Sequence, residues 1–343
     1  MKRWPESEEQ KTGIGRYGDK AERNILVRGA RCSSLHCFTL NIFGGLFRTI
    51  MGAFVRPFIR LMKRNESTDI YHAVEELSGI YLPFAKGKKV VTFHHITAKG
   101  EDFSRFGDCT IFRIIAGISI RYADVVLAVS PQTRDELIKK YKKHQEKIKV
   151  LTVEIGDQFG RIENVERSKS VLCVSSLIPR KNVAALIRSF KNVVKMPEMS
   201  DAKLIICGIG SEYENIKQLT KDLDLCSNTE FVSGLNDEEI VGLYNSASVS
   251  VLPTSHEGLG LTIIEAQRCY TPVLYFRDAQ IPEEVKRYAV PCADEDELSE
   301  QMFRCLSDEK YRDSIADAAF KYASEFGNDF GDRLFEIYEE LLK

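Results

Sequence analysis

Short runs of β-branched and other apolar residues alternate with amphipathic stretches from residue 69 onward. The runs predict strands and the stretches predict helices, and their alternation is typical of a parallel sheet covered by helices. The first series of predicted strands comprises residues 69–73, 89–93, 124–129 and 148–153. A helix is predicted after the third strand, because Ser130 is an N-cap residue and Pro131 suits the first helical position.

A second series of strands and helices follows a charged stretch at residues 160–169, which we interpret as an interdomain linker. Its predicted strands are residues 171–174, 204–207, 230–232, 249–252 and 272–275. Two such series suggest two Rossmann-like domains, 1–165 and 166–326, that face a cleft. The last helix, near 329–342, has a continuous apolar face, so we expect residues 327–343 to pack back on the first domain.

One segment, residues 42–64, differs from the rest. Its apolar residues recur at helical spacing, and its charged residues are all basic, namely Arg48, Arg56, Arg60, Lys63 and Arg64. This pattern is typical of a helix that lies in an anionic membrane interface. A domain helix packed on the sheet and kinked at Pro57 is the alternative, and the pattern leaves both open.

Length and composition narrow the classes of protein. A chain of 343 residues is too long for one hydrophobic core and suits two domains, and a net charge of −2 gives no general attraction to nucleic acid. The nine cysteines are scattered without a Cys-x-x-Cys pair, which indicates reduced thiols and neither a disulfide framework nor a zinc site. The N-terminal residues lack the apolar run expected of a signal peptide, and no stretch of about 18 apolar residues would span a bilayer. We expect a cytoplasmic protein, either soluble or peripheral on the cytoplasmic face of a membrane.

Residues 253–266 contain the most informative pattern. A strand ends at Leu252, a glycine-bearing turn follows, and a helix is predicted to begin near Gly260. The free N–H groups and the helix dipole at such a place bind phosphate. Glu257 precedes the helix and Glu265 lies about a turn and a half inside it, so both carboxylates are expected to accept hydrogen bonds from ribose or sugar hydroxyls of one ligand.

These residues resemble a known family. Glu257 and Glu265 match the Glu-x7-Glu motif of family 4 retaining glycosyltransferases, and the sequence Glu-Gly-Leu-Gly-Leu at 257–261 matches its consensus. The resemblance covers most of residues 12–285 and is tightest at 171–275. It implies a GT-B fold with an acceptor-side domain followed by a nucleotide-sugar-binding domain. It also implies transfer of a sugar from a nucleotide diphosphate donor to a glycan or lipid-linked acceptor, without a metal or another cofactor.

Further roles follow from this resemblance. The residues it implies as catalytic are His94, Lys181 and Glu257. The residues it implies as donor-binding are Gly13, Gly15, Arg180, Lys181, Gly208, Gly210, Val232, Glu257, Gly258, Leu259, Gly260, Leu261 and Glu265. In this set Gly13 and Gly15 form a glycine turn near the reacting phosphate, and Val232 ends the strand that contacts the base.

The resemblance also implies a mechanism. Negative charge develops on the departing diphosphate, and its stabilisation is the main catalytic task. Lys181 and the backbone N–H groups of 258–260 are expected to supply this stabilisation. Glu257 would hold hydroxyls of the donor sugar, Glu265 the ribose, and His94 would bond near the reacting face. The anomeric configuration is retained, and the acceptor's proton passes to the departing phosphate oxygen.

The sequence departs from the family pattern at two places. Ser176 occupies the position of an arginine that usually partners the lysine on the diphosphate, and we expect Arg180 to compensate. No strand is predicted before the glycine turn at Gly13, so either the first domain lacks an edge strand or the chain begins late.

Other interpretations stay open. A catalytically weak homologue that binds a nucleotide sugar or a partner protein, and a nucleotide-sugar epimerase on the same fold, are the alternatives. The Gly-x-Gly-x-x-Gly pattern at 13–18 lacks a preceding strand, which argues against dinucleotide binding. Asp294 and Asp296 resemble a metal-binding Asp-x-Asp, but we interpret them as an N-cap and a first-turn acid. His256 is interpreted as structural.

Overall fold

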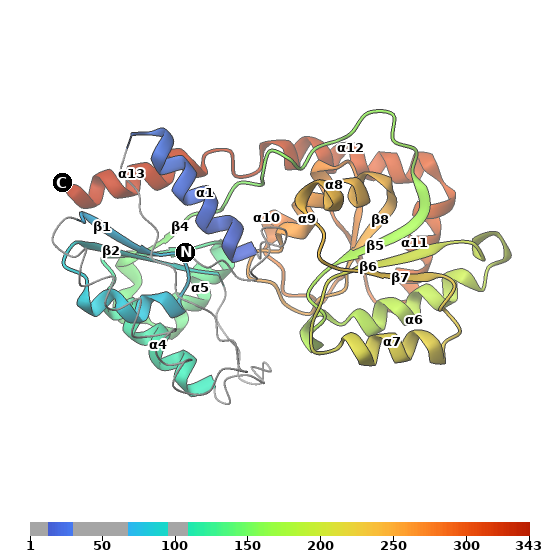
Figure 1. Ribbon diagram of the computed structural model, residues 1–343, viewed down its shortest axis with the longest axis horizontal. Coiled ribbons are helices and arrows are strands. Elements are labelled where there is room, and N and C mark those ends of the chain that lie inside the picture. The colour runs from blue at the N-terminus through green and yellow to red at the C-terminus, as the bar shows by residue number, and fades with distance from the viewer. Residues whose placement is uncertain (1–12, 30–67, 95–108) are drawn as a thin grey trace. The chain divides into compact units, whose positions relative to one another are not determined.

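The computed structural model describes residues 13–29, 68–94 and 109–343 (Figure 1). The chain divides into two compact units. One unit comprises the described residues up to Glu154 together with Gly327–Lys343, and the other comprises Ile155–Phe326. The predicted amphipathic segment at 42–64 lies outside the described residues.

The first unit contains a parallel sheet with the strand order β1-β2-β3-β4. Its strands are β1 (Ile70–Ala73), β2 (Lys88–Phe93), β3 (Val125–Ala128) and β4 (Ile148–Val150). All four predicted strands are thus confirmed. The register pairs Ala73 with Val91 and Phe93 with Ala128, so the strands end together at one edge of the sheet.

The two faces of this sheet differ because side chains alternate along each strand. Residues 71, 73, 91 and 93 face an apolar core shared with the helices on one side, which are η3 (Leu77–Phe84), α4 (Cys109–Tyr122) and α5 (Pro131–Lys140). The intervening His72 and Thr92 lie on the opposite face, where α1 (Gly13–Val27) and α13 (Phe330–Leu342) cover the sheet (Figure 1). The predicted start of α5 is confirmed, since the Thr133 N–H donates to Ser130 Oγ over 3.1 Å.

The second unit contains a six-stranded parallel sheet with the order β10-β9-β8-β5-β6-β7. Its strands are β5 (Ser168–Val174), β6 (Lys203–Cys207), β7 (Thr229–Val232), β8 (Ala247–Leu252), β9 (Val273–Phe276) and β10 (Val290–Cys292). The five predicted strands are confirmed. The sequence pattern missed β10, which is only three residues long and contains Pro291.

Helices cover both faces of this second sheet. The core on one face is shared by α6 (Val183–Val194), α7 (Tyr213–Asp222) and α11 (Glu295–Ser307). Figure 1 shows α8 (Asp237–Ser246), α9 (Leu261–Arg268) and α12 (Glu309–Glu325) on the other face. Short helical segments complete the chain at η4 (Lys142–Lys147), η5 (Pro179–Lys181), η6 (Pro197–Met199) and α10 (Glu283–Lys286).

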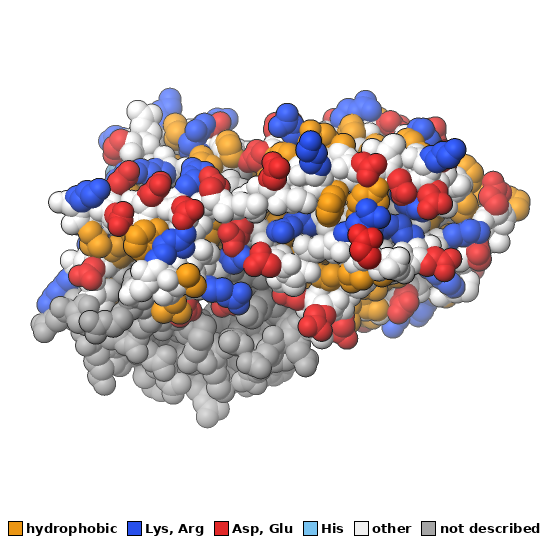
Figure 2. Space-filling view, turned by 90° about the horizontal axis from the view of Figure 1, so that it is seen from above, with side chains coloured by type: hydrophobic (Ala, Val, Ile, Leu, Met, Phe, Trp, Pro, Cys, Tyr) orange, Lys and Arg blue, Asp and Glu red, His pale blue; other side chains and the backbone are white. Residues whose placement is uncertain are grey.

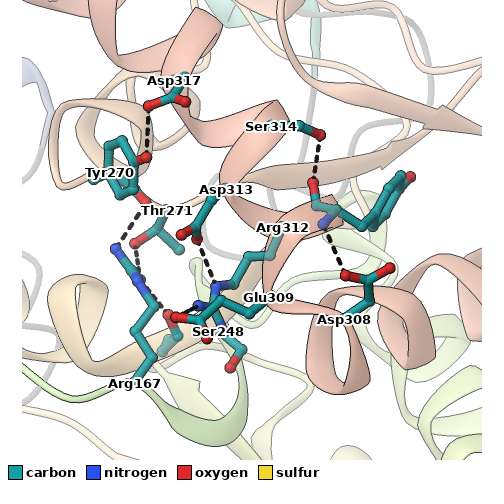
Figure 3. A network of polar contacts seen from close by, with 12 residues as sticks. Arg167, Ser248, Tyr270, Thr271, Asp308, Glu309, Arg312, Asp313, Ser314 and Asp317 are labelled. Carbon is teal, nitrogen blue, oxygen red and sulfur yellow. Dashed lines mark hydrogen bonds and ion pairs between the residues drawn. The ribbon is translucent and has the colours of Figure 1, made fainter.

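The predicted linker at 160–169 is wrong, because these residues pack within the second unit. The Ile162 N–H donates to Asn245 Oδ1 over 2.7 Å. The Arg167 guanidinium donates to the Tyr270 carbonyl at 2.7 Å and to Thr271 Oγ1 at 2.9 Å (Figure 3), and also to the Ala247 carbonyl. The fork of five donors on an arginine satisfies carbonyls that helix and strand ends leave unpaired. The boundary therefore lies at 154/155, not at 165/166 as predicted.

The described surface has no dominant sign of charge on the face that Figure 2 shows, where acidic and basic side chains are interspersed. This agrees with the net charge of −2. Among the helices that the structure describes, none combines the length and the apolar character needed to cross a bilayer.

Candidate functional site

The order of strands in the second unit reverses at β5. The chain first adds β6 and β7 on one side of β5, and it then returns to add β8, β9 and β10 on the other side. In open α/β sheets, ligands bind outside the carboxyl ends of the strands at the place where the order reverses. The loops after β5 and β8 flank this switch point, so they are the first place to look for a ligand site.

Two helices begin beside the switch point. Helix α6 starts at Val183 after Asn182, whose φ of 48° is left-handed, and α9 starts at Leu261 after Gly260, whose φ is 85°. The first N–H groups of a helix lack intrahelical partners and carry the positive end of the helix dipole. Two such ends at neighbouring strands favour an anion there. The predicted helix start near Gly260 is confirmed.

Hydrogen bonds fix the loop after β8 from two sides. The Ser255 N–H donates to the Arg180 carbonyl over 2.9 Å, and Arg180 Nη1 donates to the His256 carbonyl over 2.7 Å. On the other side, the Glu257 N–H donates to the Gln280 carbonyl and the Gln280 N–H donates to the Ser255 carbonyl, both over 2.9 Å. The loop that carries Glu257 is therefore held against the loop that carries Arg180.

A carboxylate and two cations meet at this place. Lys181 Nζ forms an ion pair with Glu257 Oε1, and Arg180 Nη1 lies 3.6 Å from Glu257 Oε2. The side chains of Lys181 and Glu257 are only 12% and 9% exposed, so little solvent screens the pair. A carboxylate in such surroundings needs compensating charge, which Lys181 and Arg180 supply. A bound polyanion would compete with Glu257 for the same two cations.

The second motif glutamate is also buried. Glu265 lies in the second turn of α9 and is 4% exposed. Glu257 lies in the loop before the same helix and is 7% exposed. The motif thus places two buried carboxylates at the amino-terminal part of one helix that starts at the switch point.

The glycines after β6 allow a close approach of two loops. An added Cβ would lie 1.9 Å from the Ser175 carbonyl oxygen at Gly208 and 2.1 Å from the Leu177 carbonyl oxygen at Gly210. Any larger residue would separate the loops after β5 and β6. The Gly208 N–H donates to the Val232 carbonyl over 3.0 Å. The structure therefore brings Gly208, Gly210 and Val232 together on one side of β5.

His94 lies in the first unit, immediately after β2. Its Nε2 is 2.8 Å from the Val74 carbonyl oxygen. Because a carbonyl can only accept, Nε2 is assigned the hydrogen, and Nδ1 of the neutral ring is then an acceptor. Burial lowers the pKa of His94 to about 4, so the ring is neutral near pH 7. It is therefore suited to accept a hydrogen bond from a hydroxyl, not to act as a cation.

The structure also describes the segment of the expected glycine turn and the position of Ser176. Gly13 and Gly15 lie in the first turn of helix α1, so the expected glycine turn is wrong as a local structure. Ser176 is exposed, whereas Arg180 lies beside Glu257.

The acidic pair near the end of the second unit caps a helix. Asp294 accepts hydrogen bonds from the N–H groups of Asp296 and Glu297, which confirms the predicted N-cap of α11. Within residues 13–29, 68–94 and 109–343, no group of three or more His, Cys, Asp or Glu side chains is placed to hold a metal ion.

Sequence reasoning missed two residues near the candidate site residues. Gln280 follows β9 and holds Ser255 and Glu257 through its backbone. Tyr17 lies on α1, and its ring packs edge-on against His94. No local sequence pattern predicts either contact, because each joins segments that are distant in sequence.

Two protein-family models match the chain. The model described as glycosyl transferases group 1 matches residues 155–322, and the model described as glycosyltransferase family 4 matches residues 20–152. The chain is 29% identical over 163 residues to the O-antigen chain mannosyltransferase RfbU of Salmonella typhimurium. That alignment covers 48% of this chain and 45% of RfbU, so the chain matches about half the length of this curated relative.

Solved structures are similar in fold. Sucrose-phosphate synthase from Thermosynechococcus elongatus gives a TM-score of 0.76 at 17% identity, with 97% of this chain and 94% of that chain covered. The Anabaena protein HepE in complex with UDP and glucose gives a TM-score of 0.71 at 18% identity, with 84% and 83% covered. At these identities the likeness shows the fold alone.

Proposed function

Since this chain belongs to the family 4 glycosyltransferases and has their GT-B fold, we propose that it transfers a sugar from a nucleotide diphosphate donor to an acceptor. One observation carries the proposal. Lys181 and Arg180 converge on the buried Glu257 between the starts of α6 and α9, at the switch point of the second sheet. This place combines cations, free N–H groups and carboxylates, which suits a diphosphate joined to a sugar.

In the proposed reaction, the bond between the anomeric carbon and a diphosphate oxygen breaks, and negative charge grows on that oxygen. Lys181 and Arg180 stabilise this charge together with the N–H groups at the start of α9. Arg180 thereby takes the part of the arginine that is absent at Ser176. These groups supply the positive charge that the departing diphosphate needs, so we propose that transfer does not depend on a divalent metal.

The carboxylates and the histidine orient the sugar. When the donor binds, Glu257 gives up part of its ion pair with Lys181 and accepts hydrogen bonds from hydroxyls of the donor sugar. Glu265 accepts hydrogen bonds from the ribose hydroxyls. His94 accepts a hydroxyl hydrogen at Nδ1. We further propose retention of the anomeric configuration, with the acceptor's proton passing to the departing phosphate oxygen.

The class of donor and acceptor is part of the proposal. A relative is named as an O-antigen chain mannosyltransferase, and a structural neighbour was solved with UDP and glucose. These names support a hexose as the transferred sugar, UDP as one candidate nucleotide and a glycan as the acceptor. Association with a membrane through residues 42–64 stays a prediction, which liposome flotation with and without the basic residues would test.

A donor panel tests the proposed function. Purified protein is incubated with UDP, GDP and ADP hexoses in the presence of EDTA, with and without glycan and lipid-linked acceptors. We expect one nucleotide to raise the melting temperature most, because ligand binding to the native state stabilises it by mass action. The same nucleotide sugar is expected to yield a glycosylated product whose anomeric configuration matches the donor. Conversion of the sugar without any acceptor would indicate an epimerase, and binding without turnover would indicate an inactive homologue.

A further inference from the structure

A hydrogen-bonded row of four polar side chains crosses the face of the first sheet that α1 and α13 cover. Tyr338 Oη lies 2.6 Å from His72 Nδ1, and His72 Nε2 lies 2.8 Å from Thr92 Oγ1. Thr92 Oγ1 in turn lies 2.9 Å from Tyr17 Oη. This row of hydrogen bonds therefore links the C-terminal helix α13 to strands β1 and β2 and then to helix α1.

Tyr17 ends this row beside His94. Its ring centroid lies 5.0 Å from that of His94 with the two planes at 90°, which is a T-shaped contact. On another side, the Tyr17 ring packs against Phe330 of α13 at 5.5 Å. Tyr17 is only 1% exposed, so both its ring and its hydroxyl are fixed by neighbours.

Hydrogen-bond satisfaction assigns a direction to the row. Burial lowers the pKa of His72 to about 3, so its neutral ring has one donor and one acceptor. If Tyr17 donates to Thr92, then Thr92 donates to His72 Nε2 and His72 Nδ1–H donates to Tyr338. In the opposite direction the Tyr17 O–H would have no acceptor among the residues that the structure describes, and a buried donor without an acceptor is costly. His72 is therefore assigned the Nδ1–H form, whereas His94 has the Nε2–H form.

We propose that Tyr17 is a positioning residue that holds the His94 imidazole in one orientation and one tautomer, with its own hydroxyl anchored through Thr92 and His72 to Tyr338. Two restraints act on the His94 ring. The Val74 carbonyl fixes Nε2, and the Tyr17 ring fixes the plane of the imidazole. Nδ1 is then presented as a fixed acceptor.

The proposal rests on the proposed function, in which that acceptor meets a hydroxyl of the donor sugar. Pre-organised polar groups cost no reorganisation when the reaction occurs. The contacts around Tyr17 also give α13 a part in positioning His94, because Phe330 packs on the Tyr17 ring and Tyr338 bonds to His72 in the same network.

Imidazole NMR provides a readout that does not depend on turnover. The chain has six histidines, so selective labelling with ¹⁵N-histidine and single His→Gln variants assigns the signals of His72 and His94. The test compares wild type with Tyr17→Leu, which removes the ring contact, and with Tyr17→Phe, which keeps the ring and loses the hydroxyl. Leu137→Ala is the matched control, because Leu137 is fully buried in the core on the opposite face of the same sheet.

We expect wild type to show fixed and opposite tautomers, Nδ1–H for His72 and Nε2–H for His94. Tyr17→Leu should move the ¹⁵N shifts of His94 toward tautomeric averaging. In a transfer assay with the donor that wild type prefers, Tyr17→Leu should lower kcat about 10-fold with a smaller change in donor KM, since only the transition-state interaction weakens. Tyr17→Phe should retain the His94 signals and change those of His72.

Several results decide the proposal. Unchanged His94 signals in Tyr17→Leu, or the same change in Leu137→Ala, would overturn it. If Tyr17→Leu does not fold, Tyr17→Met removes the aromatic contact while filling more of the space, and unchanged His94 signals in that variant would equally overturn the proposal. If Tyr17→Leu shows averaged His94 signals but the wild-type protein transfers no sugar, the positioning role is supported and the proposed function is refuted.

Discussion

Replacement of Lys181 by alanine is expected to lower kcat for sugar transfer by about 10²–10³-fold, the usual effect of removing one group that stabilises developing negative charge. Lys181 lies at the switch point with its ammonium paired to the buried Glu257, and Arg180 alone cannot replace it there. Steady-state kinetics with the preferred donor measures the effect. Lys181→Arg should recover part of the loss, because it keeps the charge but changes the geometry.

Arg188→Ala is a matched control for Lys181→Ala. Arg188 also belongs to the α6 region and forms an ion pair, but with Glu295 on the exposed surface. Its removal should leave kcat within about 2-fold, since surface pairs contribute little. Lys181→Ala should also lower the melting temperature by leaving Glu257 undercompensated, and adding Glu257→Gln should restore stability without activity. A loss of kcat no larger than that of Arg188→Ala would refute the role of Lys181.

Replacement of Glu265 by glutamine is expected to abolish the ability of the protein to distinguish a ribose donor from a deoxyribose donor. A site built to hydrogen-bond a hydroxyl rejects an analogue that lacks it, because buried polar groups are left unpaired. Glu265 is a buried carboxylate at the start of α9, where a donor's ribose is proposed to bind. We expect wild type to favour the ribose donor by about 100-fold in kcat/KM.

The comparison is a double-mutant cycle between the protein and its donor. Wild type and Glu265→Gln are each measured with the ribose donor and with its 2′-deoxy and 3′-deoxy analogues. Glu325→Gln, which changes an exposed carboxylate at the end of α12, is the matched control and should keep the full discrimination. If Glu265→Gln keeps the wild-type ratio for both analogues, Glu265 does not bind the ribose.

All strands of the two units except β10 were predictable because their apolar runs are local signals. The start of α5 at Ser130 and that of α9 at Gly260 were predictable for the same reason, since capping residues act on their own helix. The prediction failed where local signals mislead. Residues 160–169 are charged like a linker, yet Arg167 satisfies carbonyls of the second unit.

The candidate site was predictable in its motif but not in its contacts. Glu257 and Glu265 lie close in sequence, on a loop and on the helix that follows it, so a local pattern is enough to find both. The pairing of Glu257 with Lys181 spans 76 positions, and that of Tyr17 with Thr92 spans 75, so both depend on how the strands are ordered. Hydrophobic periodicity contains no information on such order. The hydrogen-bonded contact between His72 and Thr92 on the first sheet could not be predicted for the same reason.

Hydrogen–deuterium exchange with and without the preferred nucleoside diphosphate tests the placement of the donor site most directly. Bound ligand suppresses local opening, so exchange slows where the ligand contacts the backbone. We predict that protection is strongest in peptides covering residues 175–183 and 253–265, and that Lys181→Ala weakens it in both at the same ligand concentration. Protection confined to other parts of the chain, with these two loops unaffected at saturating ligand, would contradict a donor site at the switch point.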